Sequence, residues 1–393
     1  MTAEPSSDAP QKSSAGGNPF RVRRHGGKVP YLWLGMGTGT WLRFMRAGDF
    51  DITLNCLPRI LGVSLLSPVN TAVSVASEAV YGRRVARTDI VPPLFILGHW
   101  RTGTTLLHEL FGADPRHAYP TNFECVFPRT FLLTEKLGRA AGGWLVPTKR
   151  PFDDMPLGLD HPQEDDVAFA NLGMGTPYAT FAFPRHGITS LEYAELEDLS
   201  AEERERWEEQ FLAFVRRLQF AKPGKRLVLK SPIHTARIPT LLRLFPDARF
   251  VHIARNPYDV FPSTIHAWKA LASNQGLHNP VPEGDDAWSD DVLDVFMRLF
   301  EGYERGRTLI PSGRLAEIRY EDLVADPKTV IGGLYRDLDL GDFAPAEPGI
   351  SAYLQREKGH RRNRFTLSVR ERERIGERWA PYFRRFGYAV AEG

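Results

Sequence analysis

Cysteine is scarce in this sequence, whose 393 residues include two, Cys56 and Cys125. Two thiols are too few for a disulfide framework or a cysteine-rich zinc site. They fit a reducing compartment, so we expect a cytoplasmic protein. The spacing of the histidines and carboxylates shows no metal-binding motif either, and we therefore expect a reaction that requires no metal.

An excess of charge of one sign is also lacking. Lys and Arg total 50 against 48 Asp and Glu, which gives a formal net charge of +2. A strongly basic surface is the usual mark of a protein that attracts nucleic acid, so we expect no nucleic-acid partner. Any anion must be bound by a local group of residues.

Long uninterrupted apolar runs are absent as well. The first 27 residues are rich in Ser, Pro, Ala and Gly. They lack the basic and apolar regions of a signal peptide, so we predict a disordered tail over 1–27 and no secretion signal.

Residues 57–80 are more apolar, but five residues interrupt them: Pro58, Arg59, Pro68, Asn70 and Glu78. A membrane-spanning helix needs about 20 mostly apolar residues, which makes this segment a poor candidate. We predict a packed N-terminal helical region over 28–91. The alternative is peripheral contact with a membrane, from which a lipid acceptor could be reached.

Short apolar runs of the buried-strand type alternate with helical segments in the rest of the chain. They are Leu94–Leu97, Leu227–Leu229, Phe250–Ala254 and Leu315–Ile318. This alternation predicts an α/β fold with a mostly parallel sheet and helices on both faces, over residues 92–393. Residues 122–165 are rich in Pro and Gly, and we expect them to be irregular.

The first of these strands leads into a glycine-flanked loop, Gly98-x-x-x-x-Gly103-Thr104-Thr105, and then into a helix. This is the layout of a P-loop, in which backbone N–H groups and the positive end of the helix converge on an anion. A triphosphate-binding loop has Lys at the position of Thr104. Here the cation is Arg101, which favours a 5′-phosphate with an attached transferring group.

The segment from Pro93 to Leu110 resembles the 5′-phosphosulfate loop of the sulfotransferase family. It is most similar to the bacterial branch that also resembles tyrosylprotein sulfotransferases, where Arg occupies the position of Arg101. The resemblance implies that the donor is 3′-phosphoadenosine 5′-phosphosulfate and that the loop binds its 5′ end through Arg101, Thr102, Gly103, Thr104 and Thr105.

The donor of this family has a second phosphate, and a second motif matches it. Residues 250–263 resemble the family's 3′-phosphate motif, in which an Arg ends a strand and a Ser follows eight positions later. The match implies that Arg255 and Ser263 bind the 3′-phosphate, since Arg and Ser both offer hydrogen-bond donors to an anion.

A third family feature is the strand that ends on Lys230-Ser231-Pro232. The resemblance implies that Lys230 stabilises the charge on the bridging oxygen and the sulfuryl group. In a late basic loop, Arg361, Arg362 and Arg364 are candidates for closing over the donor, and we choose Arg362. Residues 319–323 also resemble a family signature, which we interpret as structural.

A general base must take the acceptor's proton. The tyrosylprotein-like branch uses a Glu a little over twenty residues after the loop arginine, which implies Glu124. His99 and His108 are the rivals. Glu164 could orient Arg101, help to bind the acceptor, or simply begin a helix with an acidic first turn.

The sequence therefore predicts a sulfotransferase that acts on a hydroxyl or amine of a small-molecule, lipid or carbohydrate acceptor. Aromatic residues that could face it are Phe123, Tyr178, Phe181 and Trp268. Two other classes remain open at this point: a P-loop kinase or NTPase, and a non-catalytic, membrane-associated protein that keeps a nucleotide fold. Neither the acceptor nor the oligomeric state can be predicted.

Overall fold

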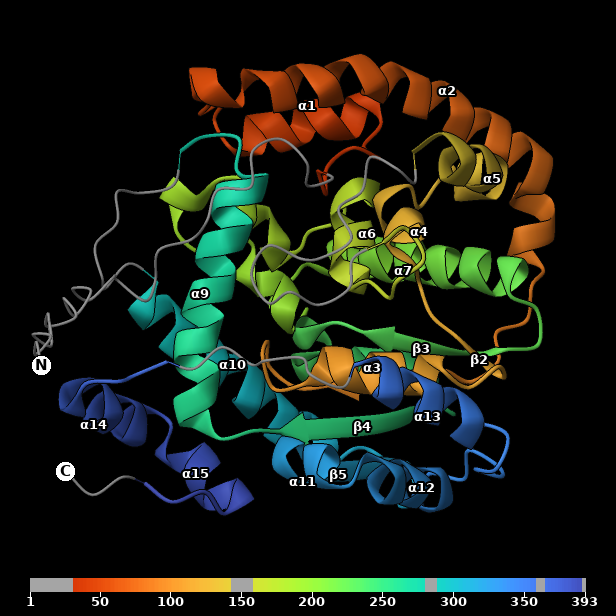
Figure 1. The fold of residues 1–393 in the computed structure, drawn as a ribbon. Helices are drawn as coiled ribbons and strands as arrows, with labels where there is room; N and C mark the ends of the chain where they lie inside the picture. Colours follow the sequence, from red (N-terminus) through yellow and green to blue (C-terminus); the bar gives the residue numbers. More distant parts are fainter. Residues whose placement is uncertain (1–30, 143–157, 280–287, 358–364, 391–393) are drawn as a thin grey trace, which may run out of the picture.

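The computed structural model describes residues 31–142, 158–279, 288–357 and 365–390. Its centre is a five-stranded parallel sheet with the order β2-β3-β1-β4-β5 (Figure 1). The strands are β1 Leu94–Leu97, β2 His117–Ala118, β3 Arg226–Lys230, β4 Arg249–Ala254 and β5 Leu315–Arg319. The predicted α/β fold with a parallel sheet is confirmed. The short β2 was not predicted, because two residues carry no periodic signal.

Side chains of the central strands alternate between two apolar cores, one on each face of the sheet. Leu94 and Ile96 of β1 lie in the core that also holds Leu107 of the following helix. Phe95 and Leu97 point the other way, into the larger core. Because both faces are buried, these strands are continuously apolar rather than alternating, as expected of a parallel sheet.

Helices cover both faces. The smaller core is covered by α3 Thr104–Gly112, α11 Tyr320–Ala325, α12 Pro327–Asp337 and α13 Glu347–Arg356. The larger core is covered by α6 Asp165–Leu172, α7 Ala201–Ala221, α8 Ile238–Leu244, α9 Pro257–Gln275, α10 Ser289–Arg307, α14 Val369–Arg378 and α15 Ala380–Phe386. Short 3₁₀ turns complete the larger side: η3 Pro177–Phe181, η4 Pro184–His186, η5 Leu191–Ala194 and η6 Pro232–Ala236.

The expectation of irregular structure over 122–165 is wrong for its first part. That part forms α4 Asn122–Val126 and α5 Phe131–Gly142. Thr121 caps α4 through a capping box, which stabilises a helix only five residues long.

The N-terminal segment forms a separate helical layer, which confirms the predicted helical extension. It consists of α1 Thr38–Ala47, the turn η1 Leu54–Cys56 and the 30-residue α2 Leu57–Ala86. Figure 1 shows α1 and α2 crossing the top of the molecule, above α4 to α7 and away from the sheet.

This layer shares its core with the rest of the chain. Trp33 and Trp41 are buried in the same apolar core as Phe95 of β1, and the Trp33 indole donates to the carbonyl of Gln275 at 2.8 Å. The boundary between residues 91 and 92 therefore stays a prediction, and the tail predicted over 1–27 lies outside the described residues.

Candidate active site

The loop after β1 has a backbone that only glycine fits at two places. Gly98 has φ +140° and Gly103 has φ +105°, and Arg101 between them is also left-handed, with φ +68°. A Cβ on Gly103 would lie 2.3 Å from Cδ2 of Tyr320, and one on Gly98 would lie 2.8 Å from the carbonyl oxygen of Ile253. The glycines therefore let the loop pass tightly over β4 and α11.

Hydrogen bonds fix the same loop in this shape. The Thr102 hydroxyl donates to the carbonyl of His99 at 2.7 Å, and the backbone N–H of Gly98 donates to the hydroxyl of Thr235 at 2.8 Å. Thr104 and Thr105 then open α3. Since the first turn of a helix leaves backbone N–H groups without intrahelical acceptors, this is a site suited to an anion.

The two predicted anion motifs lie in contact. Nε of Arg101 donates to the hydroxyl of Ser263 at 2.9 Å, and Nη1 of Arg255 donates to the carbonyl of Arg101 at 2.9 Å. The Arg255 guanidinium lies 4.3 Å from the ring centre of Tyr320 and 3.8 Å from the Asp259 carboxylate. The end of β1 and the end of β4 are adjacent in the sheet, which is why residues 154 positions apart meet here.

Lys230 is the last residue of β3 and is 2% exposed. Its ammonium donates to Oε1 of Glu164 at 2.6 Å. The other carboxylate oxygen of Glu164 accepts from the Tyr178 hydroxyl, which in turn accepts from the indole of Trp100 in the anion loop at 3.1 Å. A hydrogen-bonded chain thus connects the loop to Lys230.

Three roles were considered for Glu164, and its described contacts do not support the role of orienting Arg101. Glu164 precedes α6, but its side chain makes no capping hydrogen bond. The described hydrogen bonds of its side chain are to Lys230 and Tyr178. The carboxylate therefore orients Lys230.

A buried carboxylate–imidazole contact and a buried ion pair hold this arrangement, and sequence reasoning missed both. Asp165 lies 2.8 Å from the imidazole of His234. The carboxylate of Asp166 accepts hydrogen bonds from Nη1 and Nη2 of Arg237 at 2.9 and 3.0 Å. Burial alone would raise the pKa of Asp166, but Arg237 and Ser231 outweigh it and lower that pKa. These two contacts connect the start of α6 to the segment after β3, and so they hold Glu164 next to Lys230.

Glu124 is buried, with 1% of its surface exposed. Its Oε2 accepts from the backbone N–H of Thr121 at 2.7 Å and forms an ion pair with Lys222. Nothing in the sequence pointed to Lys222, which follows the last residue of α7 and lies 98 positions after Glu124. The role of Glu124 as the general base stays a prediction, because the same contacts are those of a residue that caps a helix.

The two rival histidines are packed residues. Burial lowers the pKa of His99 to about 3, and its Nδ1 lies 3.0 Å from the carbonyl of Trp100. His108 is buried, and its Nε2 lies 3.0 Å from the carbonyl of Val228 in β3. A side chain with so low a pKa accepts a proton poorly at neutral pH. The candidates Arg361, Arg362 and Arg364 lie outside the described residues.

The model of the sulfotransferase family matches residues 92–345, which is more than half of the chain and includes the anion loop, Lys230, Arg255 and Ser263. The chain belongs to the sulfotransferase family. It is therefore an enzyme that transfers sulfate, and the alternatives of a P-loop kinase and of a non-catalytic protein are set aside. Sulfotransferases generally use 3′-phosphoadenosine 5′-phosphosulfate as donor.

Curated relatives agree with this assignment, and two solved structures share the fold. The sulfotransferase is 40% identical over 358 residues to omega-hydroxy-beta-dihydromenaquinone-9 sulfotransferase Stf3 of Mycobacterium bovis and of Mycobacterium tuberculosis, with 91% of each chain covered. Its fold is similar to sulfotransferase STF9 from Mycobacterium avium, with a TM-score of 0.58, 20% identity, and 91% of this chain and 98% of that chain covered. It is also similar to sulfotransferase STF1 from Mycobacterium tuberculosis, with a TM-score of 0.57, 20% identity, and 87% of this chain and 90% of that chain covered.

Proposed function

We propose that this sulfotransferase transfers the sulfuryl group of 3′-phosphoadenosine 5′-phosphosulfate to a hydroxyl of a quinone-type polyprenyl lipid. The contact between Arg101 and Ser263 carries the donor half of the proposal, because it joins a 5′-phosphate loop to a 3′-phosphate motif. The 40% identical relatives, whose name specifies a hydroxylated menaquinone derivative, support the acceptor half.

The residues of the loop fit the donor's 5′ end. Gly103, Thr104 and Thr105 offer the start of α3, and Arg101 adds a cation beside it. Arg255 and Ser263 are assigned to the 3′-phosphate, since a guanidinium and a hydroxyl can both donate to it. Arg362 is our candidate for closing over the bound donor.

The transfer itself needs in-line geometry and a cation near the leaving oxygen. The donor supplies the sulfuryl group and a phosphate leaving group. Lys230 is assigned to the charge that develops on the bridging oxygen, and Glu164 holds its ammonium in place. Glu124 is assigned to the proton of the acceptor hydroxyl. We propose a transfer without metal, because the sulfuryl group carries less charge than a phosphoryl group.

Aromatic side chains beside the loop suit an apolar acceptor. Trp100 packs edge-on against Trp268, with ring centres 5.4 Å apart, and Phe181 packs against Trp268 at 6.0 Å. Tyr178, which bonds to Glu164, lies against both Trp100 and Phe181. The four side chains are buried, and the cluster places aromatic rings next to the Lys230–Glu164 pair.

Helix α2 supports access to the acceptor from a membrane. By length and composition alone, Leu54–Ala86 is long and apolar enough to span a bilayer. Several of its polar side chains, however, face the protein: Asn70 donates to the carbonyls of Leu34 and Met36, and Ser64 accepts from the indole of Trp41. We therefore propose a helix that lies on the membrane.

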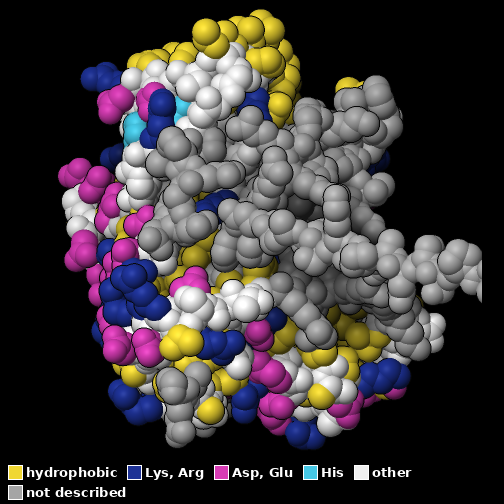
Figure 2. Space-filling model, turned by 60° about the vertical axis from the view of Figure 1, so that its left-hand side comes forward, with side chains coloured by type: hydrophobic (Ala, Val, Ile, Leu, Met, Phe, Trp, Pro, Cys, Tyr) yellow, Lys and Arg dark blue, Asp and Glu magenta, His cyan; other side chains and the backbone are white. Residues whose placement is uncertain are grey.

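The exposed side of α2 is largely apolar, although Thr71 and Glu78 are also exposed. Figure 2 shows hydrophobic side chains gathered at the top of the molecule, where Figure 1 places α1 and α2. The large exposed apolar side chains here are Leu54, Leu61, Leu65, Val69, Val75 and Val80. Exposed Arg83, Arg84 and Arg87 follow at one end and suit anionic lipid headgroups. We propose a cytoplasmic enzyme that is peripherally bound to the membrane through this face.

The test is donor-driven transfer of radiolabelled sulfate into a menaquinone-type lipid that carries a terminal hydroxyl, presented in vesicles. The matched control is the same lipid without that hydroxyl. We expect label in the hydroxylated lipid alone. Label in a water-soluble phenol or sugar but not in the lipid would overturn the acceptor, and no transfer to any acceptor would overturn the whole proposal.

A further inference from the structure

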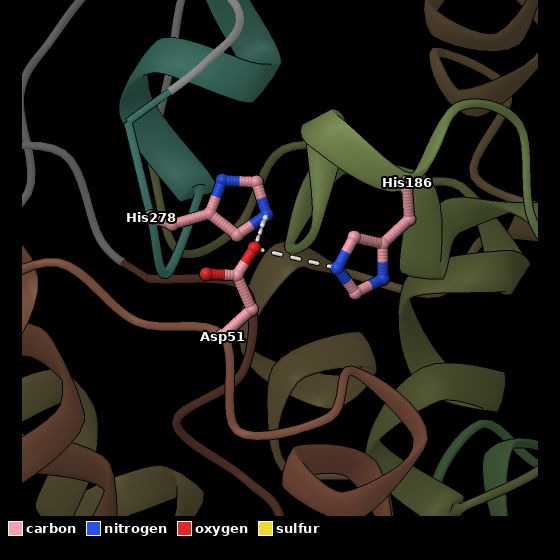
Figure 3. A group of neighbouring side chains, drawn as sticks. All are labelled: Asp51, His186 and His278. Atoms are coloured by element: carbon pink, nitrogen blue, oxygen red, sulfur yellow. Dashed lines mark ion pairs between the residues drawn. The ribbon is translucent and has the colours of Figure 1, made fainter.

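Two histidines and one aspartate meet outside the active site. Asp51 lies in the loop after α1, His186 ends η4, and His278 follows α9. Figure 3 shows both imidazole rings directed at the Asp51 carboxylate. Their ligand atoms all lie within 4.8 Å of one another, and this is the one such group among the described residues. The three are 135 and 92 positions apart in the sequence, so no spacing motif could reveal them.

The distances within this cluster fit a shared ion better than hydrogen bonds. Oδ2 of Asp51 lies 3.4 Å from Nε2 of His186 and 3.6 Å from Nε2 of His278. Hydrogen bonds between nitrogen and oxygen are usually about 2.7–3.2 Å long. Ligand atoms at about 2.0–2.2 Å from a tetrahedral zinc ion are about 3.3–3.5 Å apart.

The tautomer of His278 strengthens this assignment. Its Nδ1 lies 2.9 Å from the carbonyl of Asn279, which can only accept, so Nδ1 carries the proton. Nε2 then presents a lone pair to the Asp51 carboxylate, and two acceptors face each other. The His278 side chain is fully buried, and its Nε2 has no hydrogen-bond partner among the described residues. A backbone carbonyl on the second ring nitrogen is also the usual support of a metal-binding histidine.

Arg185 donates to both oxygens of Asp51, with Nε at 3.2 Å from Oδ2. A carboxylate oxygen has two lone pairs, so Oδ2 can accept from Arg185 and still bind an ion. The guanidinium orients the carboxylate, and its positive charge lowers the affinity for a cation.

We propose that Asp51, His186 and His278 bind a divalent transition-metal ion, with zinc the best match to two imidazoles and one carboxylate. The site joins the N-terminal helical layer to the sulfotransferase core. Three hydrogen bonds already connect the same segments: Thr53 N–H to the carbonyl of Leu277 at 3.3 Å, Asn279 N–H to the hydroxyl of Thr53 at 3.1 Å, and the Asn55 amide to the Asn279 side-chain oxygen at 2.5 Å. The ion is structural, because none of its ligands belongs to the active site.

Calorimetric titration of the chelator-treated full chain with Zn²⁺ tests this site. We expect one equivalent to bind the wild-type chain, and His186→Gln to weaken binding by at least about tenfold through loss of one ligand. The His186 side chain is 27% exposed, so its replacement should leave the fold intact. Zn²⁺ should also raise the melting temperature of the wild-type chain more than that of the variant.

His161→Gln is the matched control. His161 is 28% exposed and also lies beside a carboxylate, Glu109 at 3.1 Å, but has no third ligand. We expect the control to bind Zn²⁺ like the wild-type chain. The site is overturned if the wild-type chain binds no Zn²⁺, or if His186→Gln binds it as tightly as the control does. His278→Gln should weaken Zn²⁺ binding as much as His186→Gln does. If neither variant binds Zn²⁺ more weakly than the control, the proposed site is overturned.

Discussion

Glu124 and Glu203 occupy the same position in two copies of one local motif. Each is the third residue of a helix, and each carboxylate accepts from the backbone N–H of its capping residue, Thr121 or Ser200. Glu203 is exposed and lies on the outer helix α7, whereas Glu124 is buried and paired with Lys222. Variants at these two positions therefore distinguish a glutamate that only caps a helix from one that also takes part in catalysis.

We expect Glu124→Gln to lower kcat by roughly two to four powers of ten while donor binding is kept, because Gln can still cap the helix but cannot take a proton. Glu203→Gln is the control and should leave kcat unchanged. The measurement is steady-state transfer with calorimetric donor binding. Equal kcat values for both variants would show that Glu124 only caps α4.

The roles of single residues were predictable where they belong to a local motif and not where they depend on a distant partner. The glycine loop is visible within eight consecutive residues. The partners of Lys230 and Glu124 are not, because Glu164 and Lys222 come close only when β3, α6 and α7 pack together. The acidic first turn expected after Glu164 contains Asp165 and Asp166, yet both side chains are buried and pair with His234 and Arg237.

At the scale of elements, α2 reverses the usual pattern of a surface helix. Asn70 and Ser67 are buried, while Leu61 and Leu65 are 56% and 77% exposed. From the sequence, the polar residues looked like interruptions of an apolar helix. The structure shows why they are there: α1 and the residues before it present backbone and side-chain groups that need hydrogen-bond partners. Which face of the helix meets the protein cannot be predicted without that neighbour.

We expect Leu61→Asn/Leu65→Asn to weaken binding to vesicles of anionic phospholipid by about tenfold or more, since burial of one leucine contributes about 1.5–3 kcal/mol and the net charge is unchanged. Leu309→Asn is the control, because Leu309 is 58% exposed but lies after α10, outside the proposed membrane face. Vesicle co-sedimentation measures the effect. If the double variant and the control bind equally well, α2 is not the membrane contact.

At the scale of the whole molecule, the donor site is made by sheet topology. Strands β1 and β4 are neighbours although about 150 residues separate them, so the loop after one meets the helix after the other. Parallel strands could be predicted from alternating strand and helix segments, but their order in the sheet could not. The resemblance to a family supplied this missing information. Two phosphate motifs that bind one donor imply that the strands before them are adjacent in the sheet.

The central claim is that Arg101 and Arg255 serve two different phosphates of one donor. Arg255→Ala tests it most directly, and Arg319→Ala is the matched control: Arg319 ends β5, and its guanidinium lies 4.3 Å from the ring centre of Tyr388, just as Arg255 lies 4.3 Å from that of Tyr320.

The measurement is calorimetric binding of 3′,5′-bisphosphoadenosine and of adenosine 5′-monophosphate to the wild-type chain and both variants. We predict that Arg255→Ala weakens bisphosphate binding by about tenfold to a hundredfold, as expected for a lost charge-assisted hydrogen bond, and monophosphate binding by less than about threefold. Arg319→Ala should change neither. Equal losses for both ligands in Arg255→Ala would contradict the account, because Arg255 would then only brace the loop through the carbonyl of Arg101.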